Sequence, residues 1–589
     1  LDLGSTAKLR TLVTYLEIIA RLHAEYRSLD AKTLAQKAQP RRDVLAQWVA
    51  GMLEANPGIS LQALLDSAMA RPYSASPETF FTGGGLHNFA NFDAKDNGRV
   101  MDVWEATKNS VNLVYIRMMR DIVRHYTSAT PGAAARILED ASNPLRETYL
   151  ARFVDQEGRT FIRRFYQKHK TQTPAQMVDD LVARTRTPRR FAAVYRYLEP
   201  QADLAAFDAA LRRTFSDRAA LSPKTVESLY HAHAPDAYDL ADRGYVAQIH
   251  PLELWVVKTL RAAPQTDLQT LYDSGAGVRL EVYDWLFKTS RKNAQDIRIQ
   301  SLLEVEAFDS LLADWKRLGY PFDNLTPSYA TSIGSSGDRP AALAELMSIL
   351  VNDGVRVPMV SLTGLHFAAN TPFDTRLSMN PPVGERLMPV EVARTVRRAL
   401  ARVVEGGTAG RLAGALKAAD GTPLVIGGKT GTGDHRFERY GKGGQLLESR
   451  VVNRTATFAF YLGDRYFGTL TALVPGEIAG QFGFTSSLTA QILKTLLPQL
   501  QPHLYPSPPV SSPPPAPAAE TGPPAAPTPA APALPAPRGP LREKPDGATS
   551  QADPGAKDPP MRGGFPEDLE PGVSVPVPAM PPAPAPAAP

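Results

Sequence analysis

Apolar residues recur at helical spacing near the start of the chain and predict a helix there. This helix begins near Ser5, and one of its faces carries Leu9, Leu12, Val13, Leu16 and Ile19. A second helical stretch covers residues 100–126, breaks around Asn109 and then resumes. The segment 81–99 between the two helices is rich in Gly, Asn and Asp, which is typical of a loop, and its glycine cluster Gly83–Gly85 is typical of a flexible one.

The pattern changes in the middle of the chain. From residue 130 to about 320, arginine-rich helices with polar faces follow one another without a catalytic motif that we recognise. We therefore expect a helical insertion over residues 131–320, with its arginines on a solvated face. After residue 385 a helix leads into a β-branched, glycine-rich strand at 425–434. Two strands that should pair as a hairpin and a closing helix follow, at 455–463, 466–474 and 486–500.

Proline separates this ordered part from the end of the chain. Of the 53 prolines, 29 fall within residues 501–589, where Tyr505 and Phe565 are the only aromatic residues. A segment of this composition cannot bury a core, so we expect 501–589 to be a disordered Pro/Ala-rich tail.

Charge and cysteine content exclude several classes of protein. The 65 basic and 60 acidic residues divide into a body with a mild positive excess and a slightly acidic tail, with no long run of like charge, which argues against a nucleic-acid partner. Cysteine is absent, which excludes thiolate catalysis, iron–sulfur clusters and disulfide scaffolds. No apolar run reaches 18 residues, and the chain begins at Leu1 without a leader, so we expect any anchor to lie upstream.

The first candidate for chemistry is the sequence Ser5-Thr6-Ala7-Lys8. A hydroxyl and an amine at positions i and i+3 of a helix lie on the same face, within reach of each other. Burial lowers the pKa of a lysine, and its neutral amine can then take the proton of a nucleophilic serine. The alternative is an ordinary solvated start of a helix, because this short pattern also arises by chance.

The second candidate is Ser110-Val111-Asn112, at the break between two predicted helices. A hydroxyl there can pass on a proton, and an amide can both donate to and accept from a peptide bond. The alternative is helix capping by Asn109 or Ser110.

The third and most specific candidate is Lys429-Thr430-Gly431-Thr432. A strand edge with a cation, two hydroxyls and a glycine can receive a carboxylate, because glycine lets a ligand approach the backbone. A phosphate-binding loop is the rival interpretation, but the first glycine of that motif would have to stand at position 423, which is Pro423.

In this order, the three motifs resemble those of the penicillin-binding protein transpeptidase domain. Residues 324–361 and 396–416, the second with its Gly-Thr-Ala turn at 407–409, are similar to further segments of that family. The resemblance covers about 1–130 and 321–500 and implies an α+β fold, with an antiparallel sheet flanked by helices as in serine DD-peptidases and β-lactamases. It is closest to the bifunctional, high-molecular-mass class. In that family about a hundred residues, including two strands, precede the serine, so we expect an exposed sheet edge and poor stability of this chain alone.

The resemblance also implies roles for the motif residues. Ser5 would be acylated by a peptidoglycan stem peptide or blocked by a β-lactam, with Lys8 as base and Ser110 as proton relay. Lys429 would supply positive potential. The substrate would be held by Asn112, Thr430, Gly431 and Thr432, and the oxyanion by the backbone N–H groups of Ser5 and Thr432. No cofactor is implied. The expected location is the periplasmic face of the cytoplasmic membrane, with a glycosyltransferase domain and an anchor upstream and envelope proteins as possible partners of the insertion or tail.

Three alternatives stay open at this point. One is a DD-carboxypeptidase or β-lactamase-like hydrolase, although the Leu-Asn dipeptide of the common β-lactamase loop is missing from the chain. Another is an envelope scaffold that keeps the fold without catalysis. The third is a metal site, either at His231 and His233 or at Asp434 and His435 beside the third motif. His-x-His without a third ligand at a fixed spacing is usually a surface or capping pair, so we expect no metal.

Overall fold

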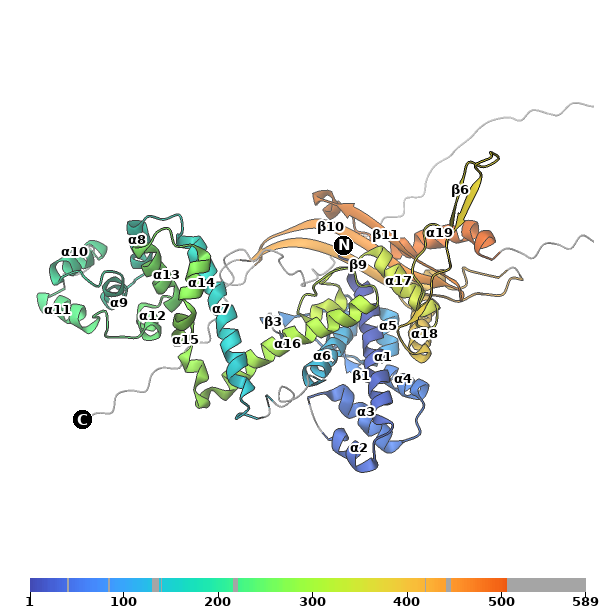
Figure 1. Ribbon diagram of the computed structural model, residues 1–589, viewed down its shortest axis with the longest axis horizontal. Helices are drawn as coiled ribbons and strands as arrows, with labels where there is room; N and C mark the ends of the chain where they lie inside the picture. The colour runs from blue at the N-terminus through green and yellow to red at the C-terminus, as the bar shows by residue number, and fades with distance from the viewer. Residues whose placement is uncertain are drawn as a thin grey trace, which may run out of the picture.

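The computed structural model describes residues 1–39, 42–82, 85–129, 137–138, 140–215, 221–418, 420–440 and 446–505. It is an α+β molecule with two lobes, which a long helix, α16 (Lys292–Arg317), connects (Figure 1). One lobe contains the main sheet and both chain segments that carry the sequence motifs. The other lobe is helical.

The main sheet has three antiparallel strands among the described residues, in the order β11-β10-β9. They are β9 (Ile426–Tyr440), β10 (Leu446–Leu462) and β11 (Tyr466–Pro475). This confirms the predicted strand and hairpin. Alternate β10 residues such as Phe458 and Leu462 pack under α18 (Val390–Gly406) and α19 (Ser487–Leu504), while Ala459 faces the larger core on the other side. The sheet therefore lies between two layers of helices.

The predicted first helix is a short 3₁₀ turn, Gly4–Thr6, followed by α1 (Ala7–Tyr26). The pattern predicted one buried face, but α1 is buried nearly all round, since other helices surround it. Some of its polar side chains bond within the helix, as when Thr14 Oγ1 donates to the carbonyl of Arg10 at 3.0 Å. Around α1 lie α2 (Ala31–Ala38), α3 (Val44–Ala55), α4 (Leu61–Met69), α5 (Val103–Asn109), α6 (Asn112–Ala129), α17 (Pro340–Val351), α18 and the short strands β1 (Pro72–Ser74) and β4 (Val100–Asp102).

The helical lobe has its own hydrophobic core, drawn from residues between Ile137 and Leu303. Its helices are α7 (Leu145–His169), α8 (Pro174–Ala183), α9 (Pro188–Leu198), α10 (Leu204–Thr214), α11 (Pro223–Ala232), α12 (Leu240–Ala247), α13 (Pro251–Ala262), α14 (Leu268–Ser274), α15 (Ala276–Val282) and the first half of α16 (Lys292–Arg317). The second half of α16 belongs to the core around α1. The helical character of this region agrees with the sequence pattern, and the bounds 131–320 stay a prediction.

Two local predictions were wrong. The segment 81–99 does not begin as a loop, because β2 (Thr79–Thr82) pairs with β3 (Gly85–Asn88); Gly83 and Gly84 lie outside the described residues. Cross-strand pairing outweighs the loop-favouring composition there. The closing helix α19 also runs past residue 500 to Leu504, although it contains Pro498 and Pro502. Buried Leu493 and Leu497 anchor it. The rest of the predicted tail, 506–589, lies outside the described residues.

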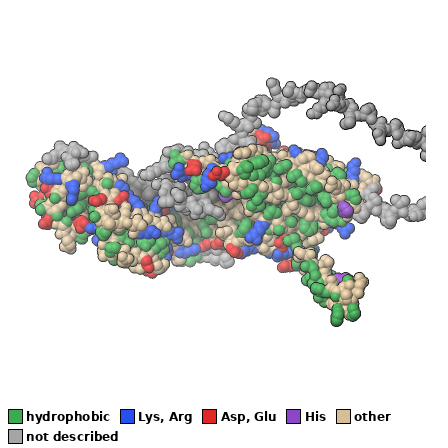
Figure 2. Space-filling view, turned by 90° about the horizontal axis from the view of Figure 1, so that it is seen from above, with side chains coloured by type: hydrophobic (Ala, Val, Ile, Leu, Met, Phe, Trp, Pro, Cys, Tyr) green, Lys and Arg blue, Asp and Glu red, His purple; other side chains and the backbone are tan. Residues whose placement is uncertain are grey.

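A narrow arm projects from the main lobe between β5 (Val355–Arg356) and β8 (Glu385–Arg386), which pair at its base. The arm contains β6 (Gly364–Phe367) and β7 (Thr375–Ser378), and it stands away from the body in Figures 1 and 2. Within the described part of the chain, no helix is both long and apolar enough to cross a membrane.

Candidate active site

Ser5 lies in the 3₁₀ turn that leads into α1, pressed against strand β9. Gly4 adopts a left-handed φ of +52°, and a Cβ on it would overlap the carbonyl of Thr432. A Cβ on Gly431 would in turn overlap the carbonyl of Leu3. Both positions therefore require glycine, since only glycine allows this backbone approach without strain. The two glycines bring the first and third motifs together.

Lys8, on the first turn of α1, points toward the hydroxyl of Ser5. Its Nζ lies 2.8 Å from Ser5 Oγ and 3.1 Å from Ser110 Oγ. The same atom lies 2.6 Å from the Ser110 carbonyl oxygen and 2.7 Å from Asn112 Oδ1. Lys8 is fully buried, whereas Ser5 and Ser110 are half-buried and so accessible to a ligand. The predicted nucleophile, base and relay therefore meet at one nitrogen atom.

Burial, and the charge of Lys429 nearby, hold the pKa of Lys8 well below its usual value. A neutral amine has two N–H bonds and one lone pair. The Ser110 carbonyl and Asn112 Oδ1 can only accept, so they take the two N–H bonds. The lone pair is then left to accept a hydroxyl hydrogen, and Ser5 Oγ lies 2.8 Å from Lys8 Nζ. This arrangement can pass the Ser5 proton to Lys8.

Ser110 owes its position to the break between α5 and α6, which was predicted at Asn109 and is confirmed. It adopts a left-handed conformation with φ 59° and ends α5. Its Oγ accepts from Lys429 Nζ at 2.8 Å, so this hydroxyl stands between two lysines. It is the one motif side chain that contacts both of the other motifs.

Asn112 is buried, and both ends of its amide have partners within the protein. Oδ1 accepts from Lys8, and Nδ2 donates to the carbonyl of Ala90 at 2.9 Å. In this structure its contact is with the base, and its predicted role in holding the substrate amide stays a prediction.

Lys429 extends from β9 and is almost completely buried. Its Nζ donates to Ser110 Oγ and to the Thr430 carbonyl at 2.9 Å. Burial lowers its pKa from 10.5 to about 7. The lysine therefore changes charge close to neutral pH.

The hydroxyls of the third motif have partners that the sequence did not predict. Thr430 Oγ1 lies 2.7 Å from Thr408 Oγ1, and Thr432 Oγ1 accepts from the backbone N–H of Ser486 at 2.9 Å. The backbone N–H of Thr408 also donates to the carbonyl of Lys108 at 3.3 Å. Thr408 thus links the end of α5 to β9. The Gly-Thr-Ala turn at 407–409 was the available signal, but it pointed to a resemblance and not to this contact.

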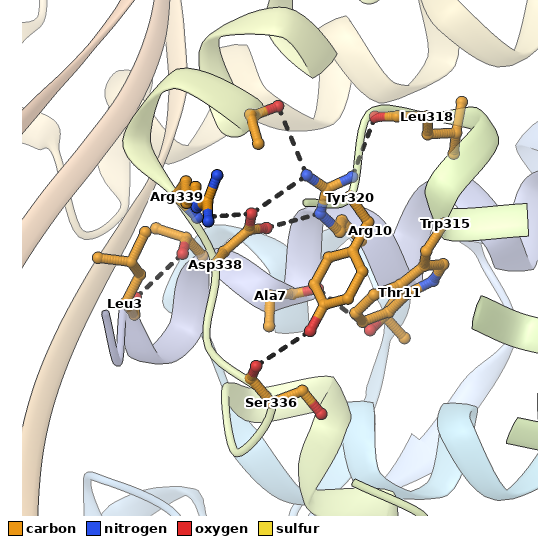
Figure 3. A network of polar contacts seen from close by, with 12 residues as sticks. Leu3, Ala7, Arg10, Thr11, Trp315, Leu318, Tyr320, Ser336, Asp338 and Arg339 are labelled. Carbon is orange, nitrogen blue, oxygen red and sulfur yellow. Dashed lines mark hydrogen bonds and ion pairs between the residues drawn. The ribbon is translucent and has the colours of Figure 1, made fainter. Parts of the chain in front are cut away.

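A buried ion pair holds α1 in place two residues beyond Lys8 (Figure 3). Arg10 Nε donates to Asp338 Oδ2 at 2.6 Å, and neither side chain is appreciably exposed. Arg10 also donates to the Leu318 carbonyl at 3.1 Å, and Tyr320 donates to the carbonyl of Ser336. The loop that carries Asp338 is in this way fastened to the helix that carries Lys8.

Within the described ranges, none of the histidines considered above as metal ligands belongs to a group of three or more potential ligands. His233 is buried, stacks on Tyr238, and has a pKa lowered to about 4 by burial. Among the described residues, His169, Asp180 and Glu253 are close enough to share an ion. However, Lys168 and Arg184 also donate to Glu253 Oε1, at 3.0 and 2.8 Å. The group is therefore an ion-pair cluster that already carries its own cations.

Comparison with known proteins adds likenesses at low identity. No protein-family model matches the chain, and no curated protein matches it. A crystal structure of penicillin-binding protein 3 from Mycobacterium tuberculosis with aztreonam is 18% identical to this chain, with a TM-score of 0.24. The match covers 35% of this chain and 50% of the other chain. PBPA from the same organism is 10% identical, with coverages of 85% and 61% and a TM-score of 0.31.

A third similar structure is the D,D-transpeptidase domain of a peptidoglycan glycosyltransferase from Eggerthella lenta. It is 12% identical, with coverages of 85% and 66% and a TM-score of 0.29. The chain spans about half the length of the first of these structures. Likenesses with TM-scores this low do not establish a function for the chain.

Proposed function

We propose that the chain is a penicillin-binding D,D-transpeptidase, which cross-links peptidoglycan stem peptides through an acyl-serine intermediate. One observation carries the proposal: the Nζ atom of buried Lys8 lies 2.8 Å from the hydroxyl oxygen of the accessible Ser5, and 2.6 and 2.7 Å from two oxygens that can only accept. A base and a nucleophile in this arrangement are what acyl transfer needs.

In the first step Ser5 Oγ attacks the carbonyl of the penultimate D-alanine, and its proton moves to Lys8. The C–N bond to the terminal D-alanine then breaks, and the departing amine takes a proton through Ser110, which contacts Lys8 and Lys429. The proton lost by the nucleophile thus reaches the leaving group. Two backbone N–H groups, of Ser5 and Thr432, meet the oxyanion, an arrangement worth roughly 3 kcal/mol of barrier per donor.

Substrate recognition falls to the third motif and its neighbours. Protonated Lys429 attracts the terminal carboxylate of the stem peptide. Burial, helped by the charge of Lys429, keeps Lys8 neutral. Thr430 and Thr432 line the same strand, and Gly431 lets the peptide backbone approach it. Thr408 orients the Thr430 hydroxyl, while Asn112 fixes the base.

The second step decides between two products. An amine from a neighbouring stem peptide resolves the acyl-enzyme and makes a cross-link, whereas water in its place gives carboxypeptidase activity. We place the chain in the bifunctional class of cell-wall synthases, at the periplasmic face of the cytoplasmic membrane, with the lipid-linked precursor as its substrate. The order of the motifs supports this context. β-Lactams would acylate Ser5 and leave it blocked.

A fluorescent penicillin tests the proposal directly. We expect it to label the full-length protein covalently, and we expect Ser5→Ala to abolish labelling. The matched control is Ser274→Ala, which changes an exposed serine of α14 in the helical lobe. Equal labelling of wild type and Ser5→Ala would refute the assignment. Release of D-alanine from a stem-peptide substrate then separates an enzyme from a scaffold that only binds the drug.

A further inference from the structure

The segment 89–97, which follows β3, holds the start of α6, the helix that carries Asn112. Ala90 accepts a hydrogen bond through its carbonyl from Asn112 Nδ2 at 2.9 Å. The next residue, Asn91, accepts through Oδ1 from the backbone N–H of Leu113 at 3.0 Å. Because α6 begins at Asn112, the N–H groups of its first turn have no carbonyl partner within the helix. Asn91 therefore caps α6 from a position 22 residues away.

Asn91 is fixed by hydrogen bonds at both ends of its amide. It is buried, and its Nδ2 donates to the Ala75 carbonyl at 2.8 Å and to Asn97 Oδ1 at 2.9 Å. The backbone N–H of Ala75 in turn donates to the Arg99 carbonyl at 2.8 Å. A donor thus faces the oxygen of the Asn91 amide, and two acceptors face its nitrogen. The side chain has one satisfied orientation, and it fixes the backbone of the segment around it.

The Ala90 carbonyl decides which end of the Asn112 amide faces Lys8. A carbonyl oxygen only accepts, so the end of the amide that faces Ala90 must be its NH2 group. The amide oxygen is then left to face Lys8 Nζ, 2.7 Å away. If the amide were turned round, its NH2 group would donate to the lone pair of neutral Lys8. It would then compete with the hydroxyl of Ser5, whose oxygen lies 2.8 Å from the same nitrogen.

We propose that Asn91 is a positioning residue for acyl transfer, which holds Ala90 and the start of α6 so that Asn112 presents its oxygen to Lys8. This inference rests on the proposed function, and Asn91 acts in it through Asn112 and not on the substrate. Without the Asn91 side chain the Ala90 carbonyl is free to move, and the Asn112 amide can turn.

The fold should survive the loss of Asn91. Arg117, on α6, also donates to the carbonyls of Ser74 and Ser76 at 2.8 and 2.7 Å. These two residues flank Ala75, to which Asn91 is bonded. The helix therefore stays fastened to this part of the chain when Asn91 is replaced.

Stopped-flow acylation of the full chain by a fluorescent penicillin tests the proposal. We expect Asn91→Ala to lower the first-order rate constant of acylation about tenfold, because Asn112 then occupies the lone pair of Lys8 in most molecules. The dissociation constant of the noncovalent complex should change less than about twofold, since Asn91 acts on the base and not on the ligand. Asp30→Ala is the matched control and should acylate like wild type. It removes an N-cap from α2, where Asp30 Oδ1 accepts from the Thr33 N–H at 2.9 Å.

A double-mutant cycle separates positioning from a mere loss of stability. In an Asn112→Ala background, Asn91→Ala should change the rate constant of acylation less than about twofold, because the amide through which Asn91 acts is gone. An equal loss of rate in both backgrounds would overturn the proposal. So would an Asn91→Ala variant that is acylated as fast as wild type.

A second variant serves if Asn91→Ala does not fold. The carboxylate of Asn91→Asp can still accept from the Leu113 N–H, but it cannot donate to the Ala75 carbonyl, so this variant should also slow acylation. Acylation of Asn91→Asp at the wild-type rate would overturn the proposal. A wild type that penicillin does not label at all would instead overturn the proposed function and this inference together.

Discussion

Replacing Lys429 by methionine should stabilise the protein at neutral pH while it destroys the activity. Burial lowers the pKa of this lysine from 10.5 to about 7, so folding at pH 7 costs about 4 kcal/mol relative to a lysine that keeps its ordinary pKa. Methionine removes this cost. It also removes hydrogen bonds to Ser110 and to the Thr430 carbonyl, each worth about 1 kcal/mol. The net expectation is a gain of about 2 kcal/mol in the free energy of unfolding.

The pH dependence makes the test specific. Between pH 7 and 10.5 the unfolded lysine still binds a proton that the folded lysine has released. The free energy of unfolding of the wild type therefore rises with pH over this window. The advantage of Lys429→Met should shrink and reverse, leaving the variant about 1 kcal/mol less stable than wild type at pH 10. Acylation by penicillin should fall at least about 100-fold, because the charge that receives the carboxylate is gone.

Urea unfolding of both proteins at pH 7 and pH 10, at one ionic strength, measures the difference. Lys494→Met, which removes an exposed lysine of α19, controls for the loss of one positive charge. A variant less stable than wild type at pH 7 would refute the reasoning, and so would a difference that does not change between the two pH values.

Three further predictions concern the same site. The rate constant for acylation of Ser5 should fall as pH rises above about 7, since Lys429 then loses its proton; a rate that climbs from pH 7 to 9 would contradict this. Asp338→Asn should lower the free energy of unfolding by about 3 kcal/mol, because it leaves Arg10 buried without its charge partner; a loss below 1 kcal/mol in urea unfolding would show that the pair contributes little. Thr408→Val should raise the KM for a stem peptide roughly tenfold by freeing the Thr430 hydroxyl, and Thr408→Ser should restore it; equal KM values for both variants would exclude this positioning role.

Local patterns allowed parts of the fold to be predicted from the sequence. The β-branched residues of 455–474 fixed a hairpin, and the polar residues around Asn109 marked the break before α6. Both features depend on neighbours in the chain. The hairpin of β2 and β3 was missed because its strands are short and its composition favours loops, so that pairing across the turn decided the outcome.

Contacts between distant residues could not be predicted in this way. The burial of Arg10 on α1 is explained by its ion pair with Asp338. These two residues are 328 positions apart, and no sequence periodicity predicts that they meet. The same holds for Thr408, which reaches Thr430 only after α18 has turned back toward β9. The motif residues themselves were found because their chemistry depends on residue types at short spacing. Their roles in a reaction stay predictions.

The helix shared by the two cores gives the molecule a mechanical property. α16 is 26 residues long and so spans about 39 Å. Its first half is packed into the helical lobe, and near its other end Trp315 donates to Thr14 of α1 at 3.1 Å. A tilt of the helical lobe would therefore be transmitted through α16 to α1, the helix that carries Lys8. A force applied to the helical lobe would therefore shift Lys8 relative to Ser110 and Lys429, although the lobe itself lies far from the site.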